Sequence, residues 1–586
     1  MNSVGEVIEV RGTRVVIRVF EESNKETLFH KGEKYKGISI REHLVIRRGF
    51  RDIVTIVEGE YLDERKLIED GDDYVRKVEL KPIGYFYEGK FYEGIKYLPM
   101  IKDEVYLVSE DNISEIYGRN DDEFVVGELL KEGVPISLPW PKLFNTHIGV
   151  FGNTGSGKSN TLANLYTKLF DLKMDKLIDK SKFVIMDFNG EYTKGQLSNS
   201  ESKAVYELNT RSDDGKKFPL DEKEFWDAEV FGILFKATEN TQKPFLSRVV
   251  RGRERFSGVQ NSLQNYVRRS FKKALSTTSP KKELSGMLKS IATLLGEEQL
   301  EGKLARLAWH GQSENFYFPP SDLLNGGEND RVYNAEFSDL VDNITVNELN
   351  PFDELIVRIN LQLVNDLLSG YVQFDHIQPL LKRIESSISS LRRVLVVGEE
   401  EDLKLLTVIS FRKANQEVKK IMPLLLAKHF YQKHKSLVVS ESPPLHTMHL
   451  IIDEAHNVLS LQSNREHESW KDYRLELFEE IIKEGRKFGM FLTLSSQRPA
   501  DISPTIMSQI HNFFIHRLVN DRDIFLLENT ITTLDNLSKG MIPNLAKGCC
   551  IVTGTSFDLP MLIQFSLLRK EHQPDSDDVD LAKLWA

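Results

Sequence analysis

The chain has 586 residues, of which 40% are apolar and 28% charged, as in ordinary soluble proteins with several domains. Its 88 acidic and 77 basic residues give a net charge of −11, which argues against a surface coated with nucleic acid but allows a basic channel. The two cysteines, Cys549 and Cys550, exclude a disulfide framework and a cysteine zinc site. No run approaches the ~18 apolar residues of a membrane helix. We expect a cytoplasmic protein with no membrane partner.

Short strand-like runs dominate residues 1–140. VGEVIEVRGTRVVIRVF predicts two strands joined at Gly12 and Thr13. RDIVTIVEG, IGYFYEGKFYEG and DEVYLVS follow, each bounded by glycine or by charged residues. Many short strands at close spacing predict a small barrel or a sandwich for this N-terminal domain.

From His147 onward the pattern changes to continuous apolar runs that alternate with helical segments. The runs are IGVFG, KFVIMDF, HLIIDEA, MFLTLSS and FFIHRL. Such runs indicate a parallel sheet covered by helices on both faces, so the fold class is α/β. GCCIVTG and MLIQF, near the end of the chain, predict an antiparallel pair at the edge of this sheet.

Residues 201–445 read as a mainly helical insertion. One of its predicted helices carries an apolar stripe made of Leu263, Val267, Phe271 and Leu275. The insertion divides the α/β core into residues 141–200 and 446–566. Residues 567–586 form a polar, acidic tail that is either disordered or docked on a neighbour through Leu584 and Trp585.

A phosphate-binding motif follows the first strand of the core. GNTGSGKS fits G-x-x-x-x-G-K-[ST] in full, between an apolar strand and an amphipathic helix. The glycines let several backbone N–H groups point at one anion, Lys158 reaches the β- and γ-phosphates, and the Ser159 hydroxyl ligates Mg²⁺. We expect ATP and Mg²⁺ here, bound by Gly152, Asn153, Thr154, Gly155, Ser156, Gly157, Lys158, Ser159 and Asn160.

An acidic pair ends the strand LIIDEA. Asp453 is expected to hold the magnesium shell and Glu454 to polarise the attacking water. The alternative is a strand end followed by a helix cap, where Asp and Glu are common. The four apolar residues ahead of the pair favour the functional interpretation.

Three further elements are less specific. Asp187 and Glu191 in DFNGEY follow the second strand, and a plain Asn-Gly turn explains them equally well. Gln497 ends the fourth strand, where a polar group can sense the γ-phosphate. Arg486 ends a predicted helix; it either reaches the active site of an adjacent subunit or complements the helix dipole, and the residues alone favour the dipole.

Together, HIGVFGNTGSGKSNTLANL, VIMDFNGEY, LIIDEAHN, KEGRKFG and SSQRPADISPTIMSQIHNFFIHRL resemble the HerA branch of the HerA/FtsK ATPases. The resemblance implies a RecA-like P-loop ATPase core with an N-terminal β-barrel and a helical insertion subdomain. It also implies a homo-hexameric ring that pumps double-stranded DNA. The insertion departs most from the family's pattern, so no residue of the pore is assigned.

The resemblance also assigns roles to residues. It implies nucleotide and magnesium binding by Lys158 and Ser159, magnesium binding by Asp453, and water activation by Glu454. Gln497 becomes the sensor and Arg486 the arginine finger that acts on a neighbouring subunit. Asp187 and Glu191 match the family's D-x-x-G-E-Y element near the nucleotide.

The family works with separate effector proteins. By resemblance, the partner is a NurA-like nuclease, another nuclease or a sirtuin-like NAD-cleaving enzyme, in DNA processing or anti-phage defence, and it docks on the N-terminal barrel. The competing hypotheses are an assembly scaffold that organises an effector without pumping DNA and, less favoured, a protein-unfolding ring.

Basic residues gather in two runs of the insertion: Arg248, Arg251, Arg253 and Arg255 in the first, and Arg268, Arg269, Lys272 and Lys273 in the second. They either line a pore and hold DNA phosphates or form solvated helix faces. The sequence does not choose between these two interpretations.

Overall fold

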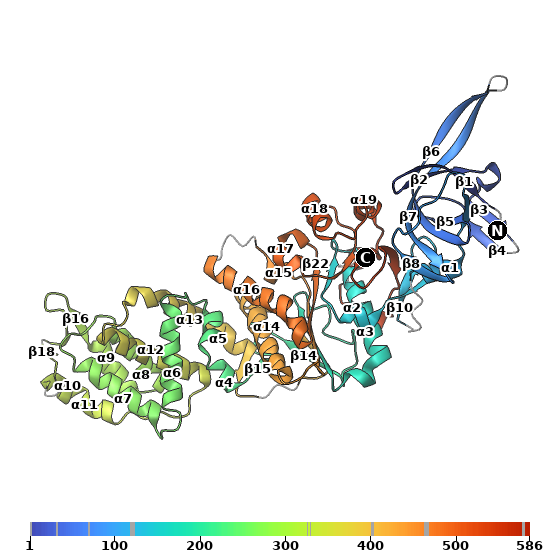
Figure 1. Ribbon diagram of the computed structural model, residues 1–586. Coiled ribbons are helices and arrows are strands. Elements are labelled where there is room, and N and C mark those ends of the chain that lie inside the picture. The colour runs from blue at the N-terminus through green and yellow to red at the C-terminus, as the bar shows by residue number, and fades with distance from the viewer. Residues whose placement is uncertain are drawn as a thin grey trace.

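The computed structural model describes residues 3–30, 33–67, 71–117, 124–320, 322–324, 326, 327, 330–399, 403–461, 468–576 and 581–585. Figure 1 shows three parts in a row, with an N-terminal barrel and a helical part at opposite ends of an α/β core. None of the helices in the described ranges is long and apolar enough to cross a membrane.

The N-terminal domain is a closed barrel, which confirms one of the two predicted architectures. Its strands are β1 (Gly5–Arg11), β2 (Arg14–Val19), β5 (His43–Arg48), β6 (Arg51–Leu67), β7 (Gly71–Tyr87) and β9 (Glu104–Leu107). They pair in the order β2-β1-β9-β5-β6-β7, and a further pairing of β7 with β2 closes the barrel. Val7, Val15 and Ile17 are among the buried side chains that fill it. β6 and β7 are 17 residues each, and Figure 1 shows their far ends projecting from the barrel as a hairpin.

Smaller elements complete this region: the hairpin β3 (Thr27–His30) and β4 (Glu33–Lys36), the strand β8 (Lys90–Glu93) beside β7, and the helices α1 (Glu110–Ile116) and α2 (Trp140–Phe144).

The core is built on an 11-stranded sheet with the order β11-β10-β25-β24-β23-β12-β22-β21-β13-β20-β14. The strands from β23 to β14 in this order are parallel. They are β23 (Asn512–Ile515), β12 (Ile148–Phe151), β22 (Met490–Ser496), β21 (Thr447–Ile452), β13 (Ser181–Asp187), β20 (Leu406–Ser410) and β14 (Lys203–Glu207). The remaining four are antiparallel: β24 (Cys549–Gly554), β25 (Met561–Phe565), β10 (Val125–Leu129) and β11 (Pro135–Ser137).

Helices bury both faces of this sheet, as the continuous apolar runs predict. Successive residues of β13 point to opposite faces, with Phe183 and Ile185 in one hydrophobic cluster and Val184 and Met186 in the other. The helix α3 (Lys158–Leu177) packs in the first cluster, and α14 (Gln416–Val438) and α16 (Glu468–Glu484) pack in the second. Shorter core helices are α15 (His456–Leu459), α17 (Pro504–Met507), α18 (Asp521–Thr530) and α19 (Asn536–Met541).

The core takes up more of the chain than its predicted bounds of 141–200 and 446–566. β10 and β11, within residues 1–140, pair beyond β25, so the antiparallel pair β24–β25 does not form the edge of the sheet. β14 and β20, within residues 201–445, form the opposite edge. Each of these strands is five residues or shorter, which leaves little periodicity to read from the sequence.

The helical part contains α6 (Gln242–Arg255), α7 (Ser262–Leu275), α8 (Leu284–Leu295), α9 (Glu298–Arg306), α10 (Arg331–Glu336), α11 (Ser338–Asp342), α12 (Pro351–Leu368) and α13 (Phe374–Val394). A small sheet of β16 (Ala308–His310), β17 (Asn315–Phe318) and β18 (Asp322–Leu323) lies beside them. The predicted stripe is confirmed, since Val267, Phe271 and Leu275 of α7 are buried.

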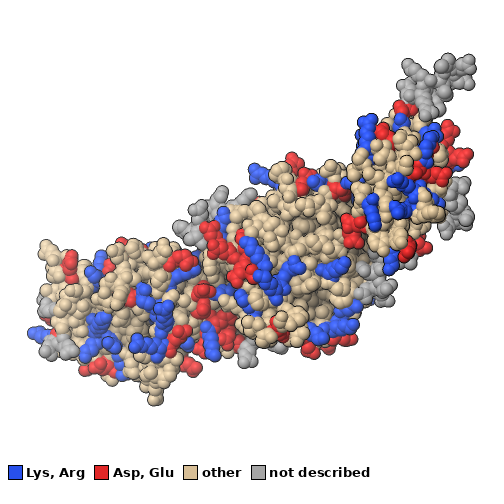
Figure 2. Space-filling view, viewed as in Figure 1, with Lys and Arg blue, Asp and Glu red and all other residues tan. Residues whose placement is uncertain are grey.

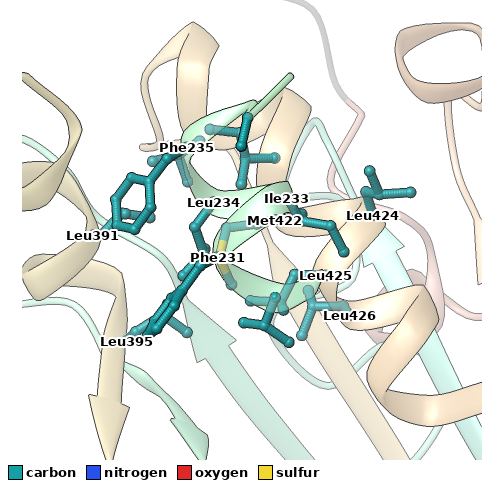
Figure 3. Close-up of a cluster of buried hydrophobic side chains, with 14 of the residues drawn as sticks. Phe231, Ile233, Leu234, Phe235, Leu391, Leu395, Met422, Leu424, Leu425 and Leu426 are labelled. Atoms are coloured by element: carbon teal, nitrogen blue, oxygen red, sulfur yellow. The ribbon is translucent and has the colours of Figure 1, made fainter. Parts of the chain in front are cut away.

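A continuous hydrophobic cluster joins the helical part to the core. Its connecting element is α5 (Ala228–Phe235), which follows α4 (Glu222–Phe225). Figure 3 shows Phe231 and Leu234 of α5 close to Leu391 and Leu395, at the end of α13 and the start of β19 (Leu395–Val397), with Met422 of α14 beside them. β19 pairs with β15 (Phe218–Leu220) at this junction.

The described part of the acidic tail packs on the core of its own chain. The backbone N–H of Asp575 donates to the carbonyl of Glu191 (2.9 Å), and the Lys194 ammonium pairs with the Asp575 carboxylate (Nζ–Oδ2 2.8 Å). Leu584, in α20 (Leu581–Leu584), and Trp585 are exposed.

Candidate nucleotide-binding site

The glycine-rich loop lies between the carboxyl end of β12, the middle strand of the 11-stranded sheet, and the first residue of α3. Gly155 (φ 74°) and Gly157 (φ 111°) adopt left-handed backbone conformations that favour glycine. A Cβ atom on Gly157 would lie 2.8 Å from the Cα atom of Gly548, so a side chain does not fit there. The first N–H groups of a helix have no intrahelical partner, and α3 therefore presents an anion-binding site at Lys158.

Neighbouring strands hold this loop in shape. The Asn153 N–H donates to the carbonyl of Arg517 (2.9 Å), and the Gly548 N–H donates to the carbonyl of Ser156 (2.8 Å). His516 is buried against the loop, and a Cβ atom on Gly152 would lie 2.5 Å from its Cβ atom. Burial lowers the pKa of His516 to about 4, so its ring stays neutral. Residues at the ends of β12, β23 and β24 thus shape the cradle.

The side chain of Lys158 points into a nest of buried carboxylates. Its Nζ atom lies 3.1 Å from Oε1 of Glu454 and 3.9 Å from Oδ1 of Asp453. Burial alone lowers the pKa of Lys158, but the two carboxylates outweigh this effect and the pKa is raised. Glu454 has φ 51°, a strained conformation for a non-glycine residue and one that is common at active sites.

Several carboxylate oxygens in this nest are buried and accept no hydrogen bond from the described residues: both oxygens of Asp453, Oε2 of Glu454 and Oε2 of Glu191. Burial raises the pKa of Asp453. Unpaired oxygens of this kind, with the Ser159 hydroxyl nearby, fit a magnesium ion that completes its coordination with water and phosphate oxygens. The described residues hold no group of three or more His, Cys, Asp or Glu side chains that alone could bind a metal.

The DFNGEY turn brings Glu191 to the nest. The Asp187 carboxylate accepts hydrogen bonds from the backbone N–H groups of Gly190 (2.7 Å), Glu191 (3.1 Å) and Tyr192 (3.0 Å). Asp187 therefore shapes the turn, as the plain-turn interpretation proposed. Glu191 contacts the Ser159 hydroxyl, and burial together with the Asp453 charge raises its pKa to about 7.

Gln497 lies against the phosphate loop. β22 is parallel to β12 and ends one residue before Gln497, whose Oε1 atom accepts a hydrogen bond from the Thr154 hydroxyl. The side chain predicted as a sensor is therefore next to the predicted phosphate site.

His456, in the first turn of α15, is a further residue of this pocket that was not predicted from the sequence. Its Nδ1 atom lies 3.3 Å from Oε2 of Glu454 and 3.2 Å from Oγ of Ser496, the last residue of β22. Burial lowers the pKa of His456, although Glu454 opposes this shift. His456 thus connects the acidic strand end with the strand that carries Gln497. Its place two residues after Glu454 in LIIDEAHN was the available signal.

Arg486 is not in this pocket. It lies in the short 3₁₀ helix η2 (Gly485–Phe488), ahead of β22, whereas Gln497 follows the carboxyl end of the same strand. β22 has seven residues, so the two ends are roughly 20 Å apart. The Arg486 side chain is exposed, and its Nη1 atom donates to Nε2 of His511 (2.7 Å). Arg486 therefore faces outward from the amino edge of the sheet.

The basic runs are partly built into the helical part. Arg248 pairs with Asp366 (Nη2–Oδ2 2.8 Å), and Arg268 donates to the carbonyl of Ile344 (Nη2–O 2.6 Å). Arg253 lies between Glu222 and Glu354. The exposed members are Arg251, Arg255, Arg269, Lys272 and Lys273. Figure 2 shows Lys and Arg mixed with Asp and Glu over the visible face of this part.

Comparisons with known proteins point in one direction. Residues 124–319 match the family model of the central domain of helicase HerA. The chain is 24% identical over 496 residues to a DNA double-strand break repair helicase HerA of Sulfolobus acidocaldarius, covering 83% of this chain and 77% of the relative. It is 25% identical over 504 residues to the protein of the same name from Pyrococcus furiosus, covering 82% and 77%.

Among solved structures, VirB4 of Thermoanaerobacter pseudethanolicus aligns with a TM-score of 0.44 and 12% identity, over 78% of this chain and 99% of that one. The family model matches the segment that includes the glycine-rich loop and DFNGEY, and the similarity to the two relatives extends well beyond that segment. An ATPase core with this loop and this acidic strand end is what the resemblance implies, and the comparisons support a HerA-type ATPase of the HerA/FtsK superfamily.

Proposed function

We propose that this ATPase is a DNA translocase that works as a homo-hexameric ring and moves double-stranded DNA through its centre. The observation that carries the proposal is the position of Arg486, which is exposed at the edge of the core sheet opposite to the phosphate loop. An arginine in that place can complete a nucleotide site only on a neighbouring subunit. The relatives named as DNA double-strand break repair helicases support DNA as the substrate.

An ion pair holds the ammonium group of Lys158 inside the site. Lys158 is paired with Glu454, and the γ-phosphate of ATP competes with Glu454 for the ammonium group. Once Lys158 turns to the phosphate, Glu454 is free to accept a proton from the attacking water. ATP binding therefore both orients the phosphates and releases the base.

The other side chains of the pocket have supporting roles in this proposal. Ser159 and Asp453 hold Mg²⁺, which neutralises charge on the phosphate oxygens when it is bound. Gln497 senses the γ-phosphate from its place beside Thr154. His456 keeps Glu454 aligned and transmits its position to Ser496 and β22.

Arg486 of the adjacent subunit stabilises the charge that gathers on the γ-phosphate in the transition state, an effect worth roughly 10³–10⁵ in rate. Hydrolysis then depends on contact between subunits, and each ATP hydrolysed can change one interface of the ring. The exposed cations of the helical part are candidates to contact DNA phosphates without reading sequence.

A separate effector couples this motor to its biological role. We place its docking surface on the N-terminal barrel, which lies on the far side of the core from the helical part. The effector is a NurA-like nuclease, another nuclease or a sirtuin-like NAD-cleaving enzyme, in DNA-end processing or anti-phage defence. The mass of the particle, alone and with the proteins encoded beside it, tests the ring and the partner together.

The test of the motor is hydrolysis and movement in one assay. We expect linear double-stranded DNA to raise the ATP hydrolysis rate, and the protein to displace the third strand of a DNA triplex when ATP is present. An ATP hydrolysis rate that DNA does not change, together with a triplex that stays intact, would favour the scaffold hypothesis. In that hypothesis, nucleotide only holds a ring around an effector. The ion pairs of Arg248 and Arg253 are compatible with that alternative, because they give these two side chains a structural role.

A further inference from the structure

Different strands of the sheet flank the phosphate loop on its two sides. β22 and β21, with Gln497 and the acidic strand end, follow β12 on one side. β23, β24 and β25 follow it on the other side. β24 is antiparallel to β23, and β25 is antiparallel to β24, so β25 runs in the same direction as β12 and its carboxyl end reaches the same edge of the sheet. The segment that leaves β25 therefore starts beside the phosphate loop, opposite to the catalytic carboxylates.

Two asparagines of α3 hold the start of this segment. The Ser566 carbonyl accepts hydrogen bonds from the side-chain amides of Asn160 (3.2 Å) and Asn164 (2.9 Å). Asn160 directly follows Ser159, so Ser566 is tied to the first turn of the helix that binds phosphate. The Oδ1 atoms of both asparagines are buried and have no hydrogen-bond partner among the described residues.

The other end of the segment is attached to the Glu191 turn. Besides the Asp575 contacts with Glu191 and Lys194, the Nδ1 atom of His572 lies 3.2 Å from the carbonyl oxygen of Gly195. Residues 566–575 thus connect α3 to the turn that carries Glu191, and both attachments flank the residues predicted to bind nucleotide.

Leu567 is the exposed apolar residue of this segment. It follows Ser566 directly, and 78% of its surface is exposed, whereas Leu568 packs against the hydrophobic cluster of the core. A triphosphate whose γ-phosphate points toward Glu454 and Gln497 extends in the opposite direction, past Asn160, toward Ser566. The nucleoside then lies beyond the phosphate loop, next to the exposed side chain of Leu567.

We propose that Leu567 forms the nucleobase subsite of this ATPase, with Asn160 and Asn164 holding the Ser566 backbone so that the Leu567 side chain covers one face of the base. The inference rests on the proposed ATP site and extends it from the phosphates to the nucleoside. A leucine side chain has no hydrogen-bonding group, so it adds affinity for a nucleotide through apolar contact.

The test separates contact with the base from contact with the phosphates. Dissociation constants are measured by calorimetry, with Mg²⁺ present, for a non-hydrolysable ATP analogue and for inorganic tripolyphosphate. We expect Leu567→Ala to weaken binding of the ATP analogue about tenfold, the scale of one apolar contact in a binding pocket, and to leave tripolyphosphate binding unchanged. Leu445→Ala is the matched control, because Leu445 is 69% exposed and precedes β21 at the opposite edge of the sheet.

Two outcomes would overturn the inference and leave the ATP site standing. One is an unchanged affinity of Leu567→Ala for the ATP analogue. The other is an equal loss of affinity for both ligands, which would place the defect in the phosphate loop. Failure of the ATP site itself looks different, because the wild-type protein would then bind neither ligand, whereas failure of DNA translocation would leave binding of both ligands intact.

Discussion

The two edges of the core sheet differ in how well their polar groups are satisfied. At the carboxyl edge, the oxygens of Asp453 and one oxygen each of Glu454 and Glu191 are buried without a hydrogen bond from the described residues. At the amino edge, His147 uses both ring nitrogens: Nε2 donates to the carbonyl of Ile482 (2.8 Å), and Nδ1 accepts from the N–H of Leu492 (3.0 Å). Unmet polar groups are costly in a protein interior.

The difference assigns different tasks to the two edges. In the proposed function, phosphates and a cation supply the missing partners at the carboxyl edge. At the amino edge, His147 is satisfied by its own chain, and His511 contacts Arg486 on the surface through Nε2, although its Nδ1 atom has no hydrogen-bond partner among the described residues. β12, β22 and β23 connect both edges, so the nucleotide pocket and Arg486, which we propose to act on a neighbouring subunit, share the same strands.

Removing Lys158 tests the carboxyl edge most severely. Lys158→Ala should abolish detectable ATP binding and lower hydrolysis by roughly 10⁴, because the buried Asp453 and Glu454 charges then face the phosphates with no cation between them. Equilibrium binding and steady-state hydrolysis measure the two effects. Lys176→Ala, an exposed lysine on the same helix, should match the wild type. Unchanged ATP affinity of Lys158→Ala would refute the assignment of the cradle.

Removing Arg486 tests the amino edge. Arg486→Ala should lower hydrolysis by roughly 10³ while ATP binding persists, since the side chain lies far from its own subunit's phosphate loop. Lys487→Ala is the control, because Lys487 is exposed in the same 3₁₀ helix.

Mixed rings distinguish an arginine that acts on its neighbour from one that only supports the fold. Subunits with Arg486→Ala and subunits with Glu454→Gln should partly restore hydrolysis when they are combined, at interfaces where an intact arginine meets an intact site. If confirmed mixed rings recover no activity at any ratio, Arg486 does not act across the interface.

Glu454→Gln separates binding from turnover at the carboxyl edge. The amide keeps the size of the side chain but cannot accept the proton of water, so ATP binding should remain and hydrolysis should fall by roughly 10². Single-turnover hydrolysis beside equilibrium binding measures both. Glu476→Gln, an exposed residue of α16, serves as the control. Near wild-type turnover in Glu454→Gln would assign water activation to another group, with Glu191 as the nearest candidate.

The sequence predicted the carboxyl edge better than the amino edge for a physical reason. A phosphate loop needs glycine at positive φ and a lysine at the start of a helix, and these needs are local, so GNTGSGKS predicts the cradle before the structure is known. Asp453 and Glu454 could be predicted in the same way, because a continuous apolar run places them at the end of a strand.

What the sequence could not predict depends on contacts between distant segments. Arg486 and His511 lie on different elements, and only the parallel order of β22, β12 and β23 brings them together. The strands β14 and β20 lie within the long segment that reads as helix, and their short apolar runs carry no period of their own. Ser566 and Asn164 likewise meet because β25 ends beside α3.

His456 offers a finer test of the network around the base. His456→Ala should lower turnover about tenfold with little change in the Michaelis constant for ATP, because Glu454 loses the imidazole that lies 3.3 Å from its Oε2 atom and keeps the side chain aligned. His456→Asn retains a hydrogen-bond donor near Glu454 and should recover part of the rate. Equal losses in the two variants would indicate that the ring is needed for packing alone.

The smallest effect concerns the pH dependence of stability at the carboxyl edge. Burial and the neighbouring Asp453 raise the pKa of Glu191 to about 7, from an ordinary value of 4.5. Between these two values the folded protein binds the extra proton, so the contribution of Glu191 to the free energy of unfolding falls as the pH rises toward 7. Glu191→Gln lacks this titration. Relative to the wild type, its melting temperature without nucleotide and Mg²⁺ should rise by a few degrees between pH 5 and pH 7.5. Glu201→Gln, which alters an exposed residue, should follow the wild type at every pH. Parallel profiles for Glu191→Gln and the wild type would mean that Glu191 is ionised throughout, and that the carboxyl edge tolerates its unpaired charges even before a ligand arrives.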